Sequence, residues 1–310
     1  MRFLVTLSVA LVLFAGCKTT RTATSPTKLV GGAPASDSQF PAVMIWTTAD
    51  VALHESYCTG TKVAADLILT AAHCVLLQDP RPGQVYLGPW RKIDEMNPGR
   101  RIQYTFQRNL ENYQPKTLEL VELLLPDVVE RCVENPDDNP DLCQFREPIP
   151  DVALLKVRPE GAFADRPVVP VAEQLVSPGA AVHIMGYGSE GETVTARPRL
   201  KFAKVEVAGQ RDLTHALSTT FAAEDGYSPW NSFFGVLRTP DQPVNLGSGD
   251  SGGPVFDAQG TAVVGVNSDG FCPLTNRYCQ ETSNSIFARI DKGAAHGVAD
   301  WLRGHLGSPR

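Results

Sequence analysis

The sequence lacks a hydrophobic run long enough to cross a bilayer as a helix. Its main apolar stretch, residues 3–15, is interrupted by Thr6 and Ser8 and is shorter than the roughly 20 residues that a spanning helix needs. No internal repeat stands out, and the 26 glycines and 24 prolines exclude a coiled-coil composition. An excess of basic residues is also missing, since 28 Lys and Arg face 34 Asp and Glu, which argues against a general nucleic-acid binder. What remains is a 310-residue chain of short strands and turns, sized for one large domain or two fused lobes.

The N-terminus has the pattern of an export signal. Arg2 precedes the apolar run, which is too short for an anchor and indicates a signal peptide. The run ends Ala15-Gly16-Cys17, which resembles a bacterial lipobox, so we expect residues 1–17 to be the signal and Cys17 to be lipidated. Ordinary cleavage nearby, with Cys17 as an incidental thiol, is the alternative. Both predict an oxidising compartment, with the protein either an outer-membrane or cell-surface lipoprotein or secreted.

The segment that follows the signal is basic and rich in Ser and Thr. Residues 18–28 have no apolar period and are predicted to form a flexible tether or short propeptide. Residues 1–28 hold four basic and no acidic side chains, which leaves 24 basic and 34 acidic residues in the body, a net charge of −10. The body is therefore more acidic than the whole chain, whose net charge is −6.

Short apolar runs flanked by turn residues predict antiparallel sandwiches or barrels. A helix is expected from Gly293 to Leu306, where apolar residues fall on one face. Another short helix is expected from Glu119 to Glu130, interrupted by Pro126. The predicted strands are Val43–Trp46, Leu67–Leu69, Val152–Leu155, Ala181–Met185 and Ala262–Val266.

Residues 126–147 form an acidic, proline-punctuated stretch that has the composition of an insertion. Cys132 and Cys143 lie close enough in sequence to pair across it. A Ca²⁺ loop is the alternative, but the EF-hand spacing is missing and no bidentate glutamate follows at the needed offset. We therefore expect a solvated surface loop closed by a disulfide.

Three motifs carry chemistry. Gly249-Asp250-Ser251-Gly252-Gly253-Pro254 sets a serine among glycines, which lets backbone amides approach a developing oxyanion without a Cβ in the way. The second motif places a histidine at the end of an apolar run, in Leu69-Thr70-Ala71-Ala72-His73-Cys74. The third places an aspartate directly before an apolar run, in Asp151-Val152-Ala153-Leu154-Leu155. The order is His, Asp, Ser, at separations of 78 and 100 residues.

Together these motifs resemble those of the trypsin-like, chymotrypsin-fold serine endopeptidases, here of a bacterial exported type. The resemblance extends from Leu29 to about Leu306, and Gly186-Tyr187-Gly188 is similar to the family's Gly-Trp-Gly segment. It implies an all-β fold of two antiparallel six-stranded β-barrels of chymotrypsin type with a C-terminal helix. The peptidase domain would span residues 29–310, with the active site in the cleft between the barrels.

The resemblance assigns a role to each residue of a catalytic triad. Ser251 would attack the scissile peptide carbonyl, His73 would accept and return the proton, and Asp151 would orient and stabilise the histidine. The backbone amides of Gly249 and Ser251 would form the oxyanion hole.

The resemblance also implies that the protein is made as a zymogen. Leu29-Val30-Gly31-Gly32 is similar to the family's mature N-terminus, so activation would cleave between Lys28 and Leu29. The freed amine of Leu29 would then pair with Asp250, whose alternative role is only to cap a turn. An activating protease is a possible partner, and cleavage at this position would release a protein lipidated on Cys17 from the membrane.

The specificity pocket departs from the trypsin pattern. Asn245 takes the position of the pocket floor, where trypsin-type enzymes have Asp, so a preference for Arg or Lys is disfavoured. Asn also has hydrogen-bond donors that could serve a polar or acidic side chain, so the primary specificity stays open. Gly247 replaces a cysteine that braces the pocket wall. Gly265 is expected near the position of a serine that supports the catalytic Asp, and Val266 with Asn267 is expected in place of the wall's Trp-Gly.

Six of the seven cysteines fit as structural pairs, and Cys17 is the seventh. The family implies Cys58–Cys74, which closes the loop that carries the histidine. Six cysteines allow fifteen pairings, and the family specifies only this one. Proximity in the sequence alone suggests the other two pairs, Cys132–Cys143 and Cys272–Cys279.

Two other classes of function compete with a peptidase. Gly249-Asp250-Ser251-Gly252-Gly253 also fits the nucleophile elbow of α/β-hydrolases, but the flanking segments do not form the required strand and helix. An inactive trypsin-like binding module is the main alternative. No cofactor or metal is expected, and the expected partner of this monomer is a protein or peptide, with no nucleic acid and a membrane only through Cys17. The remaining histidines show no metal-ligand spacing and are expected to be structural or surface residues; they are His54, His183, His215, His296 and His305.

Overall fold

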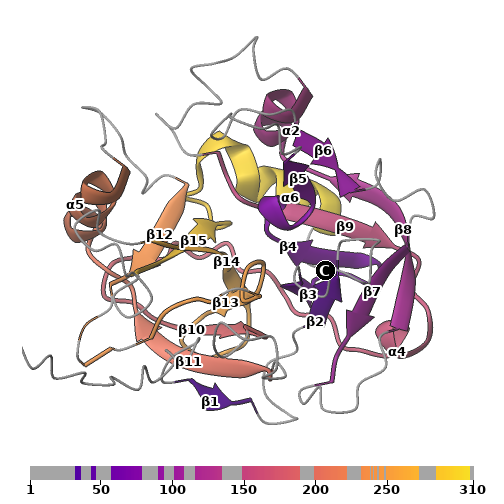
Figure 1. Cartoon of the computed structure of the whole chain (residues 1–310), viewed down its shortest axis with the longest axis horizontal. Coiled ribbons are helices and arrows are strands. Elements are labelled where there is room, and N and C mark those ends of the chain that lie inside the picture. The colour runs from indigo at the N-terminus through magenta and orange to yellow at the C-terminus, as the bar shows by residue number, and fades with distance from the viewer. Residues whose placement is uncertain are drawn as a thin grey trace, which may run out of the picture.

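Short β-branched and leucine-rich runs build two lobes of antiparallel β-structure in the computed structural model of the chain (Figure 1). Each lobe curls its sheet so that one face encloses apolar side chains. The structure describes residues 32–35, 43–46, 57–78, 90–93, 101–107, 116–134, 149–188, 199–221, 232–237, 239, 241–242, 244–247, 249–271 and 284–307.

The first lobe is a closed barrel with the strand order β2-β3-β4-β9-β8-β7. Strand β4, Leu-Ile-Leu-Thr, is buried along its whole length because it lies in the wall of the barrel beside β9, which is nearly as apolar. The six strands agree with the predicted six-stranded barrel. Their bounds are β2 Val43–Trp46, β3 Cys58–Lys62, β4 Leu67–Thr70, β7 Arg101–Thr105, β8 Lys116–Leu124 and β9 Ala153–Val157.

The second lobe is a seven-stranded curled sheet with the order β1-β11-β10-β13-β14-β15-β12. Six of these strands correspond to the predicted second barrel, and the two-residue β1 adds to the edge of β11. Among the described residues the barrel closure is found only in the first lobe. The bounds are β1 Ala33–Pro34, β10 Ala181–Gly186, β11 Lys201–Glu206, β12 Phe233–Val236, β13 Pro254–Phe256, β14 Val263–Phe271 and β15 Asn284–Arg289.

The predicted helix from Glu119 to Glu130 was wrong. This segment continues strand β8 to Leu124, since the buried Leu118 and Leu120 flank an outward Glu119 with the period of a strand. A helix, α2, begins only after Pro126, at Asp127–Glu134.

The acidic stretch 126–147 is also not a loop throughout. Helix α2 occupies its first part and buries the apolar side chains of Val128, Val129 and Val133. Its polar face pairs with the neighbouring hairpin, where Lys92 Nζ lies 2.7 Å from Glu130 Oε1. The hairpin consists of β5 (Leu76–Gln78) and β6 (Trp90–Lys92), and residues 135–148 lie outside the described part.

The C-terminal helix was predicted from Gly293, but regular α6 covers Val298–Leu306. A 3₁₀ turn, η4 (Ala295–Gly297), precedes it, and the left-handed Gly297 separates the two. Val298 and Leu302 are buried in the same apolar cluster as the first barrel, and Figure 1 draws α6 between the two lobes. The remaining helices are η1 (Ala72–Cys74), α4 (Gly161–Ala164) and α5 (Gln210–Phe221), the last of which was not predicted.

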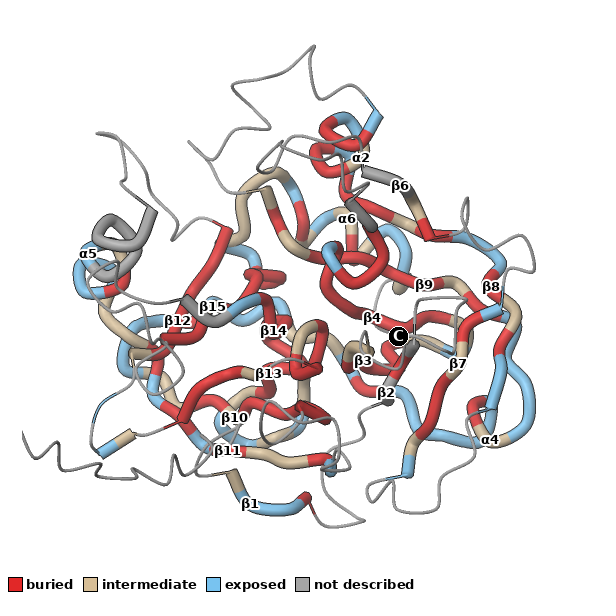
Figure 2. Tube along the Cα trace, viewed as in Figure 1, coloured by how far each residue is buried: buried red, intermediate tan, exposed pale blue. Residues whose placement is uncertain are grey.

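Buried residues follow the strands through both lobes, whereas exposed residues gather on β1, on parts of β8 and on connecting turns (Figure 2). The larger apolar cluster fills the first barrel and continues into the second lobe through Met185, Tyr187 and Val266. The two lobes therefore share one packed interface, along which the predicted site residues lie. Within the described part of the chain, no helix is long and apolar enough to span a membrane.

Candidate active site

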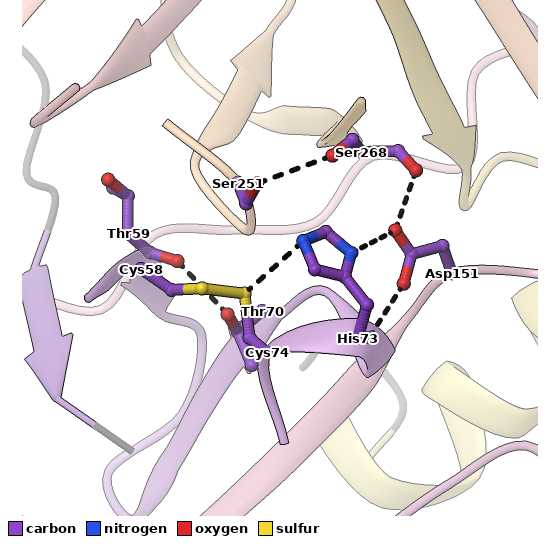
Figure 3. Close-up of polar contacts among 8 residues, drawn as sticks. All are labelled: Cys58, Thr59, Thr70, His73, Cys74, Asp151, Ser251 and Ser268. Carbon is purple, nitrogen blue, oxygen red and sulfur yellow. Dashed lines mark hydrogen bonds and ion pairs between the residues drawn. A yellow bond between two sulfur atoms is a disulfide. The ribbon is translucent and has the colours of Figure 1, made fainter. Parts of the chain in front are cut away.

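Strand pairing in the first barrel brings His73 and Asp151 together. Thr70, the last residue of β4, pairs with Ala153, the first residue of β9, so the residues just beyond these ends meet. His73 lies in the 3₁₀ turn η1 after β4, and its ring Nδ1 lies 2.7 Å from Asp151 Oδ2. The backbone amide of His73 donates to the other carboxylate oxygen, Oδ1, at 2.9 Å. Two bonds from one residue therefore fix the carboxylate relative to the ring (Figure 3).

Ser268 provides a third hydrogen bond to this carboxylate. Its hydroxyl donates to Asp151 Oδ2 at 2.6 Å, and the residue is only 5% exposed. The expectation that Gly265 lies near the position of this supporting serine was wrong by three residues. A β-bulge between Asn267 and Asp269 turns Ser268 out of the regular alternation of β14 and toward Asp151.

The corrected register changes which residues follow the supporting serine. Asp269 and Gly270 directly follow Ser268, whereas Val266 and Asn267 were expected in place of the family's Trp-Gly. Asp269 is exposed, whereas Asn267 on the other side of Ser268 is buried. One signal in the sequence could have found this register, since Ser268 is the only serine in the run from Val263 to Phe271.

Ser251 lies in the turn before β13, across the lobe interface from His73. Its carbonyl accepts the amide of Thr59 on β3 at 2.8 Å, which ties this turn to the first barrel. Its hydroxyl donates to the carbonyl of Ser268 at 3.4 Å and makes no hydrogen bond to His73 among these described residues. The ring Nε2 of His73 instead lies 3.9 Å from Cys74 Sγ (Figure 3). Rotation of the Ser251 hydroxyl is therefore needed to bring it to the imidazole.

The glycines around Ser251 allow the turn to pack against the first barrel. Gly252 has φ +79°, and a Cβ there would overlap Thr70 Oγ1 and Thr59 O. Gly249 has φ +96°, and a Cβ there would overlap the ring of Tyr57. These two positions need glycine because their backbone is left-handed and because a side chain has no space.

Two backbone amides in this turn are available to a ligand. Neither the amide of Gly249 nor that of Ser251 donates to another described residue. The neighbouring amides are occupied, since Gly252 N donates to Asn267 O at 2.7 Å and Gly253 N donates to Asp250 O at 3.0 Å.

Asp250 is completely buried beneath this turn. Its Oδ1 accepts the amide of Gly188 at 2.7 Å and its Oδ2 accepts the amide of Gly247 at 2.8 Å. Burial lowers the pKa of Lys201, and the negative charge of Asp250 opposes that effect, so this lysine senses the carboxylate. The predicted partner of Asp250, Leu29, lies outside the described residues, as do Lys28 and Cys17.

The three residues predicted for the specificity pocket are all deeply set. Asn245 is 4% exposed, and Leu246 beside it donates its amide to Ser285 Oγ at 2.9 Å. Asn267 has no exposed surface and donates its amide group to Met185 O and Asp250 O, so it braces the turn that carries Ser251. Gly265 faces the ring of Phe234 in the core of the second lobe, which leaves no contact with a substrate.

The interaction between His73 and Asp151 raises the pKa of the imidazole and lowers the pKa of the carboxyl group. Burial lowers the pKa of His73, but the charge and hydrogen bond of Asp151, with a further contribution from Asp269, outweigh it and raise the pKa to about 8. Burial raises the pKa of Asp151, but the His73 charge and the bonds from His73 and Ser268 outweigh it and lower the pKa. Asp151 is thus ionised at neutral pH, where it can stabilise an imidazolium.

One disulfide joins two described cysteines. Cys58 and Cys74 are bonded across a separation of 16 residues, as the resemblance implied, and this bond holds η1 to the start of β3. It also removes both thiolates from the only described trio of potential metal ligands, which is Cys58, His73 and Cys74. Cys132 is disulfide-bonded as well, while its predicted partner Cys143 and the predicted pair Cys272–Cys279 lie outside the described residues.

Comparison with known proteins identifies the family. The family model described as Trypsin matches residues 29–292, which is most of the chain. The chain belongs to the trypsin family. This trypsin-family chain is also similar to the phenoloxidase-activating enzyme of Bombyx mori, with 24% identity over 240 residues. That alignment covers 74% of this chain and 51% of the silkworm enzyme, so the chain spans about half the length of this relative.

Proposed function

We propose that this protein is a serine endopeptidase that hydrolyses peptide bonds with Ser251, His73 and Asp151. The observation that carries the proposal is the chain of contacts around Asp151. Its carboxylate holds the imidazole Nδ1 at 2.7 Å and accepts Ser268 Oγ at 2.6 Å, and the carbonyl of that same Ser268 contacts the Ser251 hydroxyl. A carboxylate, an imidazole and a hydroxyl in this order are the groups that nucleophilic acyl transfer requires.

In the proposed reaction, the Ser251 hydroxyl rotates away from Ser268 O toward His73 Nε2. Its oxygen attacks the peptide carbonyl while His73 takes the proton, and Asp151 stabilises the resulting imidazolium. The amides of Gly249 and Ser251 donate to the oxyanion, an interaction worth about 3–4 kcal/mol per donor at the transition state. His73 then protonates the leaving amine, and water hydrolyses the acyl-enzyme by the reverse path.

We propose further that the protein is activated by cleavage between Lys28 and Leu29. The buried carboxylate of Asp250 supports this, because it already holds the amides of Gly188 and Gly247 and lies under the turn that carries Ser251. A new ammonium group at Leu29 would pair with this carboxylate and order the turn. The neutral floor residue Asn245 makes self-cleavage after a lysine unfavourable, so a different protease would perform the activation.

Export and a lipid at Cys17 complete the proposal. The apolar residues 3–15 and the sequence Ala15-Gly16-Cys17 support it. If Cys17 is lipidated, cleavage after Lys28 detaches the peptidase from the membrane. Detergent phase partition with mass spectrometry tests this, since active protein that still carries the lipid and residues 18–28 would contradict release.

The function itself is tested with protein that begins at Leu29 and a library of unmodified peptides. The expected result is cleavage at defined bonds, which Ser251→Ala abolishes and which Asp250→Asn strongly reduces. An uncleavable Lys28→Gln precursor serves as the control and should be nearly inactive. A folded, processed protein that cleaves no peptide would instead favour the inactive binding module. The observation that supports this alternative is that the Ser251 hydroxyl donates to Ser268 O and not to His73.

A further inference from the structure

The disulfide between Cys58 and Cys74 lies against the imidazole of His73 (Figure 3). Cys74 Sγ lies 3.9 Å from His73 Nε2, and one potential ligand atom from each of the three residues lies within 4.8 Å of the other two. A tetrahedral Zn²⁺ ion, with bonds of about 2.3 Å to sulfur and about 2.0 Å to nitrogen, holds such atoms about 3.6 Å apart. The three side chains are therefore close to the spacing of a zinc site, and the S–S bond is what withholds the two sulfurs from a metal.

The other nitrogen of the His73 ring has the partner that a metal-binding histidine requires. Nδ1 lies 2.7 Å from Asp151 Oδ2, which favours the tautomer with the proton on Nδ1 and the lone pair on Nε2. Asp151 is held in turn by the hydroxyl of Ser268 at 2.6 Å and the amide of His73 at 2.9 Å. Zinc-binding histidines are oriented by carboxylates in this way, so Nε2 is ready to bind a metal.

The backbone keeps the two cysteines together when the S–S bond is broken. Cys58 is the first residue of β3 and pairs with Ile45 of β2, whereas the amide of Cys74 donates to the carbonyl of Ala71 at 3.2 Å in η1. The Cα atoms of the two cysteines are 6.2 Å apart. These backbone bonds do not involve the disulfide, so reduction leaves two thiols beside the imidazole.

Reduction of this bond by a dithiol is a two-electron exchange. The dithiol closes its own disulfide, the S–S bond between Cys58 and Cys74 breaks, and each sulfur receives one proton. A divalent ion then displaces both thiol protons to the solvent and binds two thiolates and the neutral imidazole. The side chain of His73 is 42% exposed and Cys58 is half-buried, so the reductant and the ion reach the site from the solvent.

We propose that reduction of the Cys58–Cys74 disulfide turns Cys58, Cys74 and His73 into a Zn²⁺ site with water as the fourth ligand, and that the bound ion blocks peptide hydrolysis. Two thiolates and one imidazole, with an open fourth position, are a known donor set for zinc. The ion occupies Nε2, the nitrogen that must accept the Ser251 proton in the proposed reaction. The metal site itself is independent of the proposed peptidase function, whereas the loss of hydrolysis rests on it.

Titration with Co²⁺, which binds zinc sites and absorbs light when bound to thiolate, tests the metal site without an activity assay. Protein that begins at Leu29 contains every residue that the structure describes and omits Cys17. After reduction by a phosphine, which becomes its oxide, this protein should bind Co²⁺ with a thiolate-to-metal absorption band that added Zn²⁺ removes. The same protein before reduction should show no band.

Substitutions distinguish this site from the other cysteines. Cys58→Ser/Cys74→Ser should remove the band after reduction. The matched control is Cys272→Ser/Cys279→Ser, which removes as many thiols elsewhere in the chain and should keep the band.

The two residues on the histidine side have separate expected effects. Asp151→Asn should weaken Co²⁺ binding about ten- to hundredfold, as is typical when the carboxylate partner of a metal-binding histidine is lost. His73→Ala should weaken it at least as much, because a ligand is removed. Unchanged Co²⁺ affinity in His73→Ala would show that the imidazole is no ligand and would overturn the proposed site.

Circular dichroism shows whether the reduced protein is still folded. If it unfolds, Cys58→Ser without reductant carries the test, because this variant keeps its other disulfides and has Cys74 as a free thiol beside His73. Co²⁺ should then give a weaker thiolate band in Cys58→Ser and none in Cys58→Ser/Cys74→Ser. A folded Cys58→Ser protein without a band would overturn the inference.

Peptide hydrolysis is the second readout. Zn²⁺ should abolish hydrolysis by the reduced protein, a chelator should restore it, and the unreduced protein should be unaffected. Folded, reduced protein without the cobalt band, a band that persists in Cys58→Ser/Cys74→Ser, or hydrolysis that continues with the site filled would each overturn the inference, while hydrolysis by the unreduced protein leaves the proposed function standing. Cobalt binding at the three residues with no hydrolysis in any state would contradict the proposed function and support the metal site alone.

Discussion

Replacing Gly252 with alanine isolates the steric demand of the turn that carries Ser251, because the chain offers a matched control. Gly179 has φ +78°, nearly the same as the +79° of Gly252, but a Cβ at Gly179 would meet nothing within 4 Å. At Gly252 the Cβ would overlap Thr70 Oγ1 and Thr59 O. The two substitutions therefore share the left-handed strain and differ only in the clash.

The expected magnitudes follow from these two contributions. A left-handed alanine costs about 1–2 kcal/mol, partly offset by the lower entropy of the unfolded chain, so Gly179→Ala should destabilise by about 1 kcal/mol. Overpacking adds about 1–3 kcal/mol, which makes Gly252→Ala about 2–4 kcal/mol less stable than the wild type. Gly252→Ala should also disturb the bond from its amide to Asn267 O and so reduce peptidase activity.

Urea unfolding followed by tryptophan fluorescence measures the free energy of unfolding of both variants, with peptide hydrolysis as the second readout. Equal losses of stability in Gly179→Ala and Gly252→Ala would refute the reasoning, because the clash would then have no cost. Full activity in Gly252→Ala would show that the turn tolerates a side chain at the lobe interface.

Three further predictions concern the site and its support. The value of kcat/KM should fall as the pH drops through about 8, because His73 must be neutral to act as a base and its pKa is raised to about 8. A pH profile whose acidic limb has its midpoint near the ordinary histidine pKa of 6.5 would contradict the proposed environment. Ser268→Ala should lower kcat/KM about ten- to hundredfold by removing a hydrogen bond to a carboxylate worth about 1.5–3 kcal/mol, and Ser268→Thr should recover part of it. Lys62→Met should lower the free energy of unfolding, measured in urea, by about 3 kcal/mol. The reason is that Lys62 Nζ donates to three backbone carbonyls, those of Phe163, Ala164 and Arg166. An unchanged stability would show that water can replace the ammonium group as the donor to these carbonyls.

Local motifs predicted those parts of the molecule whose function requires contiguous residues. The turn that carries Ser251 needs glycine at Gly249 and Gly252 for its backbone conformation, so this structure is specified by six contiguous residues. The same is true of His73, which follows a wholly buried strand and precedes a disulfide-bonded cysteine. The short apolar runs between turns predicted antiparallel sandwiches or barrels, and the resemblance to the trypsin-like family implied the two barrels.

Features that depend on long-range register were harder to predict. Ser268 was missed because a bulge in β14 shifts the strand alternation. Nothing in the local sequence marks this bulge except the serine itself, which has no partner residue in the register with β15. Strand β8 was mistaken for a helix because a register shift between Leu120 and Glu122 breaks the strand alternation of its buried leucines, and only pairing with β7 and β9 shows the strand. Helix α2 was missed because it lies in an acidic, proline-punctuated stretch whose composition indicated a loop, although its apolar residues fall on one buried face.

In the proposed mechanism Ser251 is a nucleophile activated by His73. Labelling with a biotinylated fluorophosphonate, followed by mass spectrometry of the digested protein, tests it most directly on folded protein that begins at Leu29. We expect one label, on the peptide that contains Ser251, with strongly reduced labelling in His73→Ala and a rate that rises with pH through about 8. Folded, processed protein whose Ser251 remains unlabelled would contradict the account and leave a trypsin-family binding module as the better description.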